Sequence, residues 1–224
     1  MITVPTLLTT TKEELSAQIQ LFQKYYKRIQ LDIADGLLVP NKTVQIEEII
    51  DLITDNRKLI PKNLVFDFHL MVKDFASELE KIAQIKAKNI NVNAVLINFE
   101  NGPDVATLEG KYNFTIGLDI FPSTQIGDLA REYDLSKIRH IQIMTVNPGF
   151  QGSPFLPEML NKIQQLRDSF YSKEILIDGG VNSKTLPIIN SKEKKPDVIC
   201  IGSYLTKAGS DLGHRVEELQ LLEK

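Results

Sequence analysis

The sequence has little cysteine, no tryptophan and no long apolar run. One Cys among 224 residues excludes a disulfide framework and a multi-cysteine zinc site. No stretch approaches the roughly 18 consecutive apolar residues of a membrane-spanning helix, so we expect no membrane association. Lys and Arg number 26 against 29 Asp and Glu. A nucleic-acid-binding protein usually carries a basic excess, so no nucleic-acid partner is expected.

The composition that remains is that of a globular protein. Hydrophobic residues make up 42% and charged residues 25% of the chain, which excludes a disordered or collagen-like protein. The segment MITVPTLLTTTKEEL contains no basic leader followed by an apolar stretch, so secretion is not expected. We see no low-complexity segment and no linker. The sequence therefore predicts a cytoplasmic protein with one domain over residues 1–224.

Short runs rich in Ile, Val and Leu recur along the chain, and each has the length and composition of a β-strand. They begin at Ile2, Arg28, Leu64, Ala94, Phe114, His140, Glu174 and Val198. Amphipathic helical patterns lie in most of the gaps, at Glu14–Tyr26, Ile46–Ile53, Phe75–Ile85 and Met159–Leu166. The gap at residues 102–110 predicts only a short or irregular helix. Eight strands alternating with helices predict parallel pairing and a single (β/α)8 TIM barrel.

Several strands carry polar residues toward their carboxyl ends. Gln30 and Asp32 share one face of the second strand, His69 lies in the third, and Asp178 ends the seventh. In an α/β barrel these ends meet at the active-site face. The four side chains can form a divalent metal site or an acid–base pair. Each alone is more simply a strand-end residue bonded to backbone, but their convergence favours a functional cleft.

Glycines form a second group at the same predicted face. Gly149 and Gly152 follow the sixth strand, Gly179 and Gly180 follow the seventh, and Gly202 with Ser203 follows the eighth. The loops after strands seven and eight commonly bind phosphate in such barrels, through backbone N–H groups. Alternatively the glycines only permit tight turns. Two pairs beside a polar cleft favour a phosphate site.

The sequence resembles the ribulose-phosphate 3-epimerase family over nearly its whole length. The matching pieces are PTLL (5–8), LDIADGLLVPN (31–41), DFHLM (67–71), MTVNPGFQG (144–152), IDGGV (177–181) and IGS (201–203). The resemblance implies an isomerase that epimerises C3 of a ketopentose 5-phosphate, such as D-ribulose 5-phosphate to D-xylulose 5-phosphate. Its partner would be a small phosphorylated sugar, and relatives commonly form homo-oligomers.

The same resemblance implies roles for individual residues. Asp32 and Asp178 would be the acid and base of an enediolate mechanism. The ligands of a divalent metal (Zn, Fe, Mn or Mg) would be position 30 with Asp32, His69 and Asp178. The substrate would be contacted by the glycines and Ser203 named above and by Thr6, Asn41, Met71 and Met144.

The chain departs from the family at several of these positions. Gln30 stands where the family has His, and an amide is a weaker, harder ligand that favours Mn²⁺ or Mg²⁺ over Zn²⁺. Ala34 replaces a pocket Met, Asn98 stands where His is common, and Gln151 replaces a loop Gly. Asp119 is an additional carboxylate in the fifth strand. It could compensate for the missing imidazole or cap a strand end, and we favour the cap.

Three hypotheses follow from these observations. The first is the metal-dependent epimerase, favoured because both candidate acid–base residues are retained. The second is a catalytically weakened or non-catalytic phosphosugar-binding protein, because of Gln30. The third is a different reaction on the same phosphate-binding barrel, since fold alone does not fix function. We expect no catalytic role for His140, His214 or Cys200.

Overall fold

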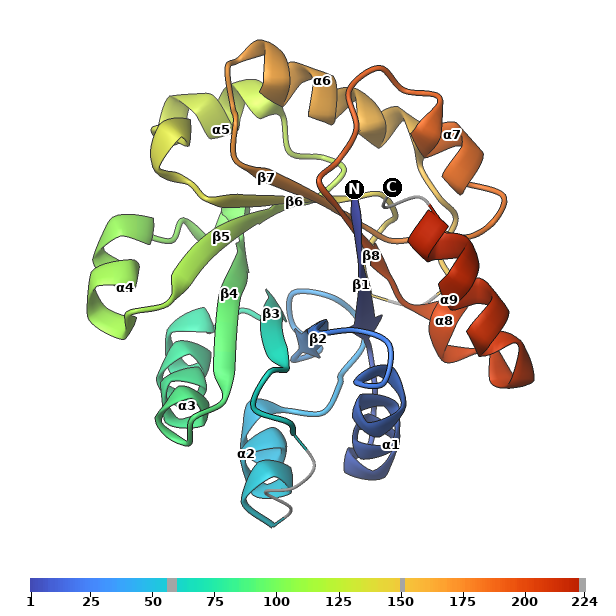
Figure 1. The fold of residues 1–224 in the computed structure, drawn as a ribbon. Coiled ribbons are helices and arrows are strands. Elements are labelled where there is room, and N and C mark those ends of the chain that lie inside the picture. Colours follow the sequence, from blue (N-terminus) through green and yellow to red (C-terminus); the bar gives the residue numbers. More distant parts are fainter. Residues whose placement is uncertain (56–59, 150–151, 222–224) are drawn as a thin grey trace.

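The structure is a computed structural model that describes residues 1–55, 60–149 and 152–221. Within these residues the strands close into a parallel barrel in the order of the chain, with the helices on the outside (Figure 1). This confirms the predicted (β/α)8 fold. The strands are β1 Ile2–Leu7, β2 Arg28–Ala34, β3 Val65–Met71, β4 Asn91–Asn98, β5 Thr115–Ile120, β6 His140–Met144, β7 Glu174–Asp178 and β8 Val198–Ile201.

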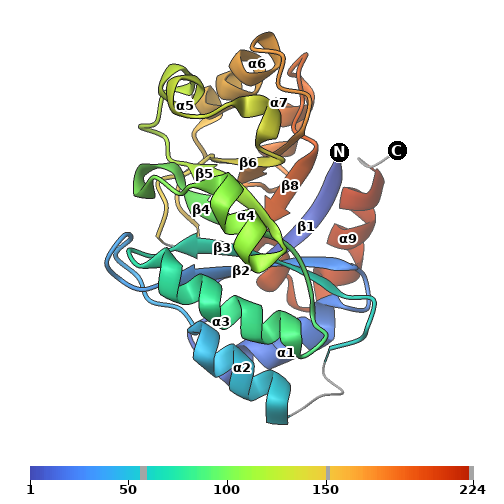
Figure 2. The same ribbon diagram turned by 90° about the vertical axis from the view of Figure 1, so that its left-hand side faces the viewer.

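The α-helices that cover the barrel are α1 Lys12–Phe22, α2 Ile46–Asp55, α3 Phe75–Ala87, α4 Val105–Tyr112, α5 Ile126–Glu132, α6 Asn161–Asp168, α7 Leu186–Asn190, α8 Ser203–Thr206 and α9 Leu212–Gln220. Short 3-10 turns are η1 Phe99–Asn101, η2 Leu135–Lys137, η3 Pro157–Leu160 and η4 Gly209–Asp211. Residues 102–110, for which only a short or irregular helix was predicted, contain most of the regular helix α4. Figure 2 shows α9 beside β1, as Figure 1 does, so the last helix covers the first strand. No helix in the described part of the chain is long and apolar enough to cross a membrane.

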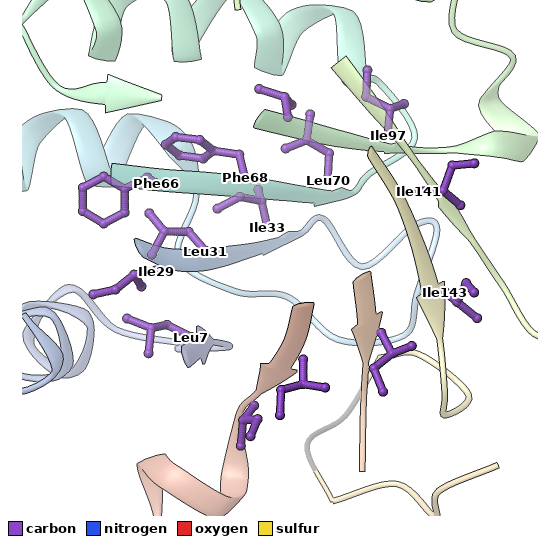
Figure 3. Close-up of a cluster of buried hydrophobic side chains, with 14 of the residues drawn as sticks. Leu7, Ile29, Leu31, Ile33, Phe66, Phe68, Leu70, Ile97, Ile141 and Ile143 are labelled. Carbon is purple, nitrogen blue, oxygen red and sulfur yellow. The ribbon is translucent and has the colours of Figure 1, made fainter. Parts of the chain in front are cut away.

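The main hydrophobic core lies between the strands and the helices. Alternate strand residues such as Leu31, Phe68 and Ile141 belong to one large cluster of buried side chains, part of which is drawn in Figure 3. The amphipathic helices supply the other half, for example Leu15 and Ile19 of α1. Burial of apolar surface stabilises this layer by about 25 cal/mol per Å². Because successive side chains of a strand point to opposite faces, the other set of alternating residues points into the barrel.

The barrel interior has an apolar middle layer between polar residues at its two ends. A small apolar cluster of Val4, Leu96, Leu176, Val198 and Cys200 fills its middle. Gly117 of β5 faces this interior, where an added Cβ would lie 2.6 Å from Leu96 Cδ2 and 2.8 Å from His140 Cβ. Only a residue without a side chain fits there, and the close approach brings β4 and β6 together around β5.

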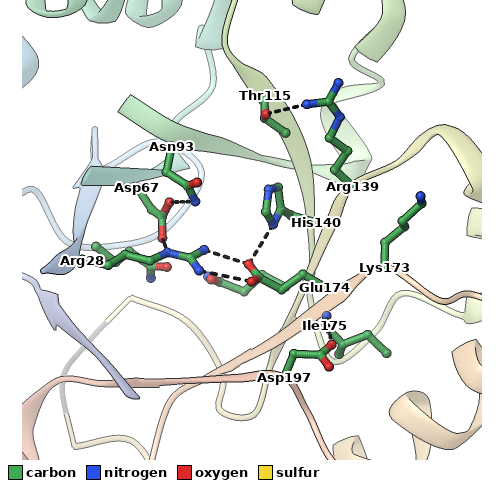
Figure 4. Close-up of polar contacts among 12 residues, drawn as sticks. Arg28, Asp67, Asn93, Thr115, Arg139, His140, Lys173, Glu174, Ile175 and Asp197 are labelled. Atoms are coloured by element: carbon green, nitrogen blue, oxygen red, sulfur yellow. Dashed lines mark hydrogen bonds and ion pairs between the residues drawn. The ribbon is translucent and has the colours of Figure 1, made fainter. Parts of the chain in front are cut away.

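The amino-terminal end of the barrel is closed by an ion network (Figure 4). Arg28 Nε donates to Asp67 at 2.6 Å, and its Nη atoms donate to both carboxylate oxygens of Glu174 at 2.8 and 3.2 Å. His140 Nδ1 lies 2.8 Å from Glu174 Oε1, and Asn93 Nδ2 donates to Asp67 Oδ1 at 2.8 Å. His140 thus lies at the base of the barrel, away from the carboxyl ends of the strands.

Candidate active site

Asp32, His69 and Asp178 meet inside the barrel at the carboxyl ends of β2, β3 and β7. One ligand atom of each residue lies within 4.8 Å of the corresponding atoms of the other two. Strand register produces this grouping, because Asp32 is paired directly with His69 and both point inward. The structure therefore brings together three of the four residues that the sequence suggested for a metal site as a compact group of potential ligands.

The geometry of the group is asymmetric about the imidazole. His69 Nδ1 lies 3.2 Å from Asp32 Oδ1 and 3.8 Å from Asp178 Oδ2. His69 is fully buried, whereas Asp32 and Asp178 keep 7% and 5% of their surface exposed. The two carboxylates are thus the parts of the group that an incoming molecule can reach.

The buried environment changes the acidity of these groups. Burial, followed by the negative charge of Asp32, raises the pKa of Asp178 to about 8. Burial alone would lower the pKa of His69, but the negative charge of Asp119, whose Oδ2 lies 3.4 Å from Nε2, and the contact of Nδ1 with Asp32 raise that pKa well above its usual value. Asp178 therefore holds a proton more readily than an ordinary aspartic acid does.

Gln30 lies in the same group and is fully buried. Its Nε2 donates to Asp178 Oδ2 at 2.8 Å, to Asp32 Oδ1 at 3.1 Å and to Thr6 Oγ1 at 3.2 Å. Its Oε1 accepts from the Cys200 thiol at 3.4 Å. The amide nitrogen, rather than the oxygen, faces the carboxylates. Gln30 could therefore act as a ligand only if its amide flipped by 180° so that Oε1 took the place of Nε2.

The donor set fits a divalent cation. Two carboxylates and one imidazole nitrogen are ligands that Zn²⁺, Fe²⁺ and Mn²⁺ accept. Among the described residues, the ion-pair contacts of Asp32 and Asp178 are to His69 and not to Lys or Arg. The raised pKa values of Asp178 and His69 mean that protons offset the clustered negative charge, and a divalent cation could take the place of those protons. Asp32, His69 and Asp178 are therefore the residues that could hold a metal.

A cleft opens above this group and is lined by most of the predicted substrate-contacting residues. Asp32 and Asp178 form part of its wall together with Thr6, Met71, Met144, Gly149, Gly152, Gly179, Gly180, Gly202 and Ser203. Gln30 and His69 do not line it and lie beneath its floor. Asn41 does not line it either, although the preceding Pro40 lies 2.9 Å from the position of a Cβ on Gly149.

The loops after β6 and β7 have the backbone conformations for which glycine is suited. Gly149, Gly179 and Gly180 have φ values of 125°, 110° and 70°, a region that other residues rarely adopt. The tight-turn explanation for these glycines therefore holds, and it is compatible with a phosphate site because the same turns line the cleft. Gln151, the predicted replacement of a loop glycine, lies outside the described residues, as does Phe150.

Two contacts to Asp178 were missed by the sequence interpretation. Gln142 is fully buried on β6, and its Nε2 lies 3.3 Å from Asp178 Oδ2. Thr145 Oγ1 donates to the backbone oxygens of Asp178 and Gly179 at 2.9 and 2.6 Å. Gln142 could have been found by strand alternation, since it lies two residues before Met144 and therefore on the same face. Thr145 follows the strand and lies in the segment MTVNPGFQG that matches the family, but no role was predicted for it.

The expectation that Asp119 caps a strand end is wrong. Asp119 is fully buried inside the barrel, with Oδ2 at 3.4 Å from His69 Nε2. Asn98 Nδ2 donates to the same oxygen at 3.2 Å. Strand pairing places Asn98 directly beside Asp119, and their side chains meet on the inner face. A residue that caps a strand end would instead meet solvent and unpaired backbone groups.

Comparison with known proteins identifies the family. The sequence pattern of the ribulose-phosphate 3-epimerase family matches residues 2–206. The chain belongs to this family. Relatives named ribulose-phosphate 3-epimerase include the Helicobacter pylori protein, 29% identical over 199 residues that cover 86% of this chain and 84% of the relative. The Bacillus subtilis protein is 30% identical over 192 residues, which cover 81% and 77%.

A rice relative named ribulose-phosphate 3-epimerase, cytoplasmic isoform, is 26% identical over 164 residues, covering 73% of this epimerase-family chain and 69% of the rice protein. Solved structures show a more distant likeness. The tryptophan synthase A-subunit of Pyrococcus furiosus has a TM-score of 0.68 at 14% identity, with 98% and 97% of the two chains covered. Orotidine 5'-monophosphate decarboxylase of Methanocaldococcus jannaschii has a TM-score of 0.58 at 15% identity, with 97% and 96% covered. At such identities the likeness establishes the fold alone.

Proposed function

We propose that this chain epimerises C3 of a ketopentose 5-phosphate, interconverting D-ribulose 5-phosphate and D-xylulose 5-phosphate. Membership of the epimerase family supports the reaction class. The observation that carries the proposal for this particular chain is the placement of Asp32 and Asp178. Their carboxylates converge at the floor of one cleft, and both line it. The cytoplasm, which the name of the rice relative gives for that protein, is the proposed location.

The two carboxylates would share the proton transfers. One takes the proton from C3, and the electron pair of the broken C–H bond moves into the enediolate. The other gives its proton to C3 from the opposite face, so the configuration inverts and no atom is gained or lost. A divalent cation held by Asp32, His69 and Asp178 would polarise the C2 oxygen and stabilise the developing negative charge.

The rest of the cleft would hold the substrate in place. The glycine turns after β6 and β7, with Gly202 and Ser203 after β8, line the cleft and would give backbone N–H groups to the phosphate. Thr6, Met71 and Met144 line the same cleft, and the two thioethers would exclude water from the enediolate. Asn41 would act from its loop rather than from the cleft wall.

Exchange of the C3 proton with solvent tests this function directly. Protein loaded with Mn²⁺, Fe²⁺ or Zn²⁺ should incorporate deuterium from D₂O at C3 of ribulose 5-phosphate and form xylulose 5-phosphate, both observed by NMR. Asp32→Asn and Asp178→Asn should each abolish turnover while the circular dichroism spectrum stays unchanged. Asp168→Asn is the control, since Asp168 ends α6 at the opposite end of the barrel. Substantial activity in either cleft variant would contradict the two-carboxylate mechanism.

A second candidate function has one observation in its favour. The amide nitrogen of Gln30 already donates to both carboxylates, which partly satisfies them without a cation. We infer as the alternative a phosphosugar-binding protein that does not turn over its ligand. It predicts that ribulose 5-phosphate raises the melting temperature with no deuterium incorporation in the presence of any of the three metals. Deuterium incorporation by the wild-type protein would exclude it.

A further inference from the structure

Asp119 is a buried carboxylate that the proposed proton transfers do not use. It lies on β5, opposite the acid–base pair, and contacts the far side of the His69 ring at 3.4 Å. Asn98 holds it there. Asn98 Nδ2 donates to Asp119 Oδ2, while Asn98 Oδ1 accepts from the backbone N–H of Glu100 at 3.0 Å. The orientation of the amide is thereby fixed, and the position of the carboxylate with it.

Few groups compensate for the burial of Asp119. Among the described residues, its ion-pair contact is to His69, and its Oδ1 accepts no hydrogen bond. The ammonium of Lys162 interacts with Asp119 by charge alone, because its N–H groups donate to the backbone oxygens of Phe121, Pro122 and Thr124. A buried carboxylate is costly unless it is paired. The short polar contacts of Asp119 are those to Asn98 and to the His69 ring, so its charge acts directly on the imidazole.

The two ring nitrogens of His69 face different partners. Nδ1 faces Asp32 and Asp178, and Nε2 faces Asp119. A neutral imidazole carries one N–H and one free lone pair. If Nε2–H donates to Asp119, the lone pair is on Nδ1 and points toward the two cleft carboxylates. Carboxylates that accept the second N–H of a ligating histidine fix its tautomer and strengthen it as a ligand.

We propose that Asp119 is a positioning residue of the metal site. It accepts Nε2–H of His69, sets Nδ1 as the ligand atom, and strengthens this imidazole as a ligand, which compensates for the weaker amide at Gln30. The inference rests on the proposed function only in that both involve the same cation site. Asp119 does not touch the substrate cleft, since the cleft is lined by Asp32 and Asp178 but not by Asp119.

Metal affinity, measured without substrate, tests the proposal. Mn²⁺ and Co²⁺ binding would be measured by competition with a chromophoric chelator, together with the visible absorption spectrum of the Co²⁺ form. Asp119→Asn should weaken both affinities by about 10–100-fold and shift the Co²⁺ bands. Asn98→Ala keeps the carboxylate but removes its hydrogen-bond donor, and should weaken binding by a smaller factor. It also serves as the second variant if Asp119→Asn does not fold.

Asp67→Asn is the matched control. Asp67 is also a fully buried strand carboxylate, but it pairs with Arg28 at the base of the barrel. Its loss should lower the melting temperature and leave metal affinity unchanged. Wild-type affinity in Asp119→Asn, an equal loss in Asp67→Asn, or no Mn²⁺ or Co²⁺ binding by the wild-type protein would each overturn the proposal.

Compensation for Gln30 has its own test. In a Gln30→His background, Asp119→Asn should weaken metal binding by a smaller factor than in the wild-type background. An equal factor in both backgrounds would overturn the compensation. The measurements also separate this inference from the proposed function. A protein that binds metal through an Asp119-dependent site without epimerising supports this inference alone, and an active enzyme indifferent to Asp119→Asn supports only the proposed function.

Discussion

Gln30 Nε2 lies 2.8 Å from Asp178 Oδ2, and the same nitrogen also donates to Asp32. A neutral amide thus bridges the two residues that the proposed reaction uses as acid and base. The bridge holds the carboxylates near one another, but its N–H groups occupy the carboxylate oxygens that would otherwise coordinate a cation. Gln30 therefore competes with a metal for these oxygens unless its amide flips.

Replacing Gln30 tests this competition. Gln30→His should raise the affinity for Zn²⁺ and Mn²⁺ by about 10-fold or more, because an imidazole lone pair replaces an N–H donor. Loss of a residue that only hydrogen-bonds to a metal ligand already costs about 10-fold in affinity. Isothermal titration calorimetry with each metal would measure the affinity. Gln20→His on α1 is the control for a surface imidazole, because Gln20 is exposed. Equal affinities in Gln30→His and the wild-type protein would show that the amide already serves as a ligand.

The turn after β7 has no room for a side chain. A Cβ on Gly180 would lie 2.9 Å from Phe155 Cβ and 3.0 Å from Phe155 Cα, and φ is +70°. Gly180→Ala should lower the free energy of unfolding by about 1–3 kcal/mol from overpacking and weaken inorganic phosphate binding, because the turn must move. Urea unfolding and phosphate titration would measure the two effects.

Gly127→Ala is the matched control for this substitution. Gly127 lies in α5, and nothing is within 4 Å of its added Cβ. The change should stabilise the protein by up to about 1 kcal/mol through helix propensity and leave phosphate binding unchanged. If Gly180→Ala binds phosphate as tightly as Gly127→Ala does, the turn is not part of a phosphate site.

The ion network at the barrel base predicts a pH dependence of stability. Hydrogen bonds from His140 and Arg28 and the charge of Arg28 outweigh the effect of burial and lower the pKa of Glu174 from 4.5 to about 2. A carboxyl whose pKa is lower in the folded than in the unfolded state stabilises the folded protein. Its contribution is fully present at pH values above the unfolded-state pKa of 4.5, and it is lost as pH falls from 4.5 to about 2. The size is at most about 3 kcal/mol, at 1.36 kcal/mol per pKa unit.

Glu174→Gln removes this titration. The variant should be less stable than the wild-type protein at pH 7, and the difference in unfolding free energy should narrow between pH 4.5 and pH 2. Urea unfolding at pH 7, 5, 4 and 3 would follow it. Glu193→Gln, at a side chain that is 85% exposed, should leave the stability curve unchanged. A constant gap between Glu174→Gln and the wild-type protein at every pH would contradict the prediction.

Lys162 holds the loop that follows β5. Its side chain is buried, and Nζ donates to the backbone oxygens of Phe121, Pro122 and Thr124 at 2.9, 3.0 and 2.7 Å. Lys162→Met keeps an unbranched apolar side chain that is one atom shorter, and it leaves three acceptors without this donor. Each hydrogen bond to a charged group contributes about 1.5–3 kcal/mol, so we expect a loss of at least about 3 kcal/mol in urea unfolding.

Lys24→Met is the matched control, because Lys24 is exposed just after α1. It should change stability by less than about 0.5 kcal/mol. A loss of similar size in both variants would show that Lys162 has no special role in holding the loop.

Most of the architecture was predictable because it follows from local periodicity. The runs beginning at Ile2, Arg28 and His140 became strands at those residues, since alternating or continuous apolar character leaves a short segment few other ways to bury its surface. Thr11 accepts from the N–H of Glu14 and begins α1, as its side chain suggests. The predicted start of the fourth strand at Ala94 was late, because the polar residues Asn91 and Asn93 hid the first three residues of β4, of which Asn91 and Val92 pair with β3.

The amino-acid sequence alone determined the barrel, the shared face of Gln30 and Asp32, and the candidate residues Asp32, His69 and Asp178. Only the tertiary structure decided which atoms meet across the barrel. Gln142, Asp119 and Asn98 acquired partners on other strands, and the amide of Gln30 turned its nitrogen to the carboxylates. Alternation assigns a side chain to a face, but strand register and closure of the barrel set the distances between faces. Those distances depend on all eight strands together, so no local pattern contains them.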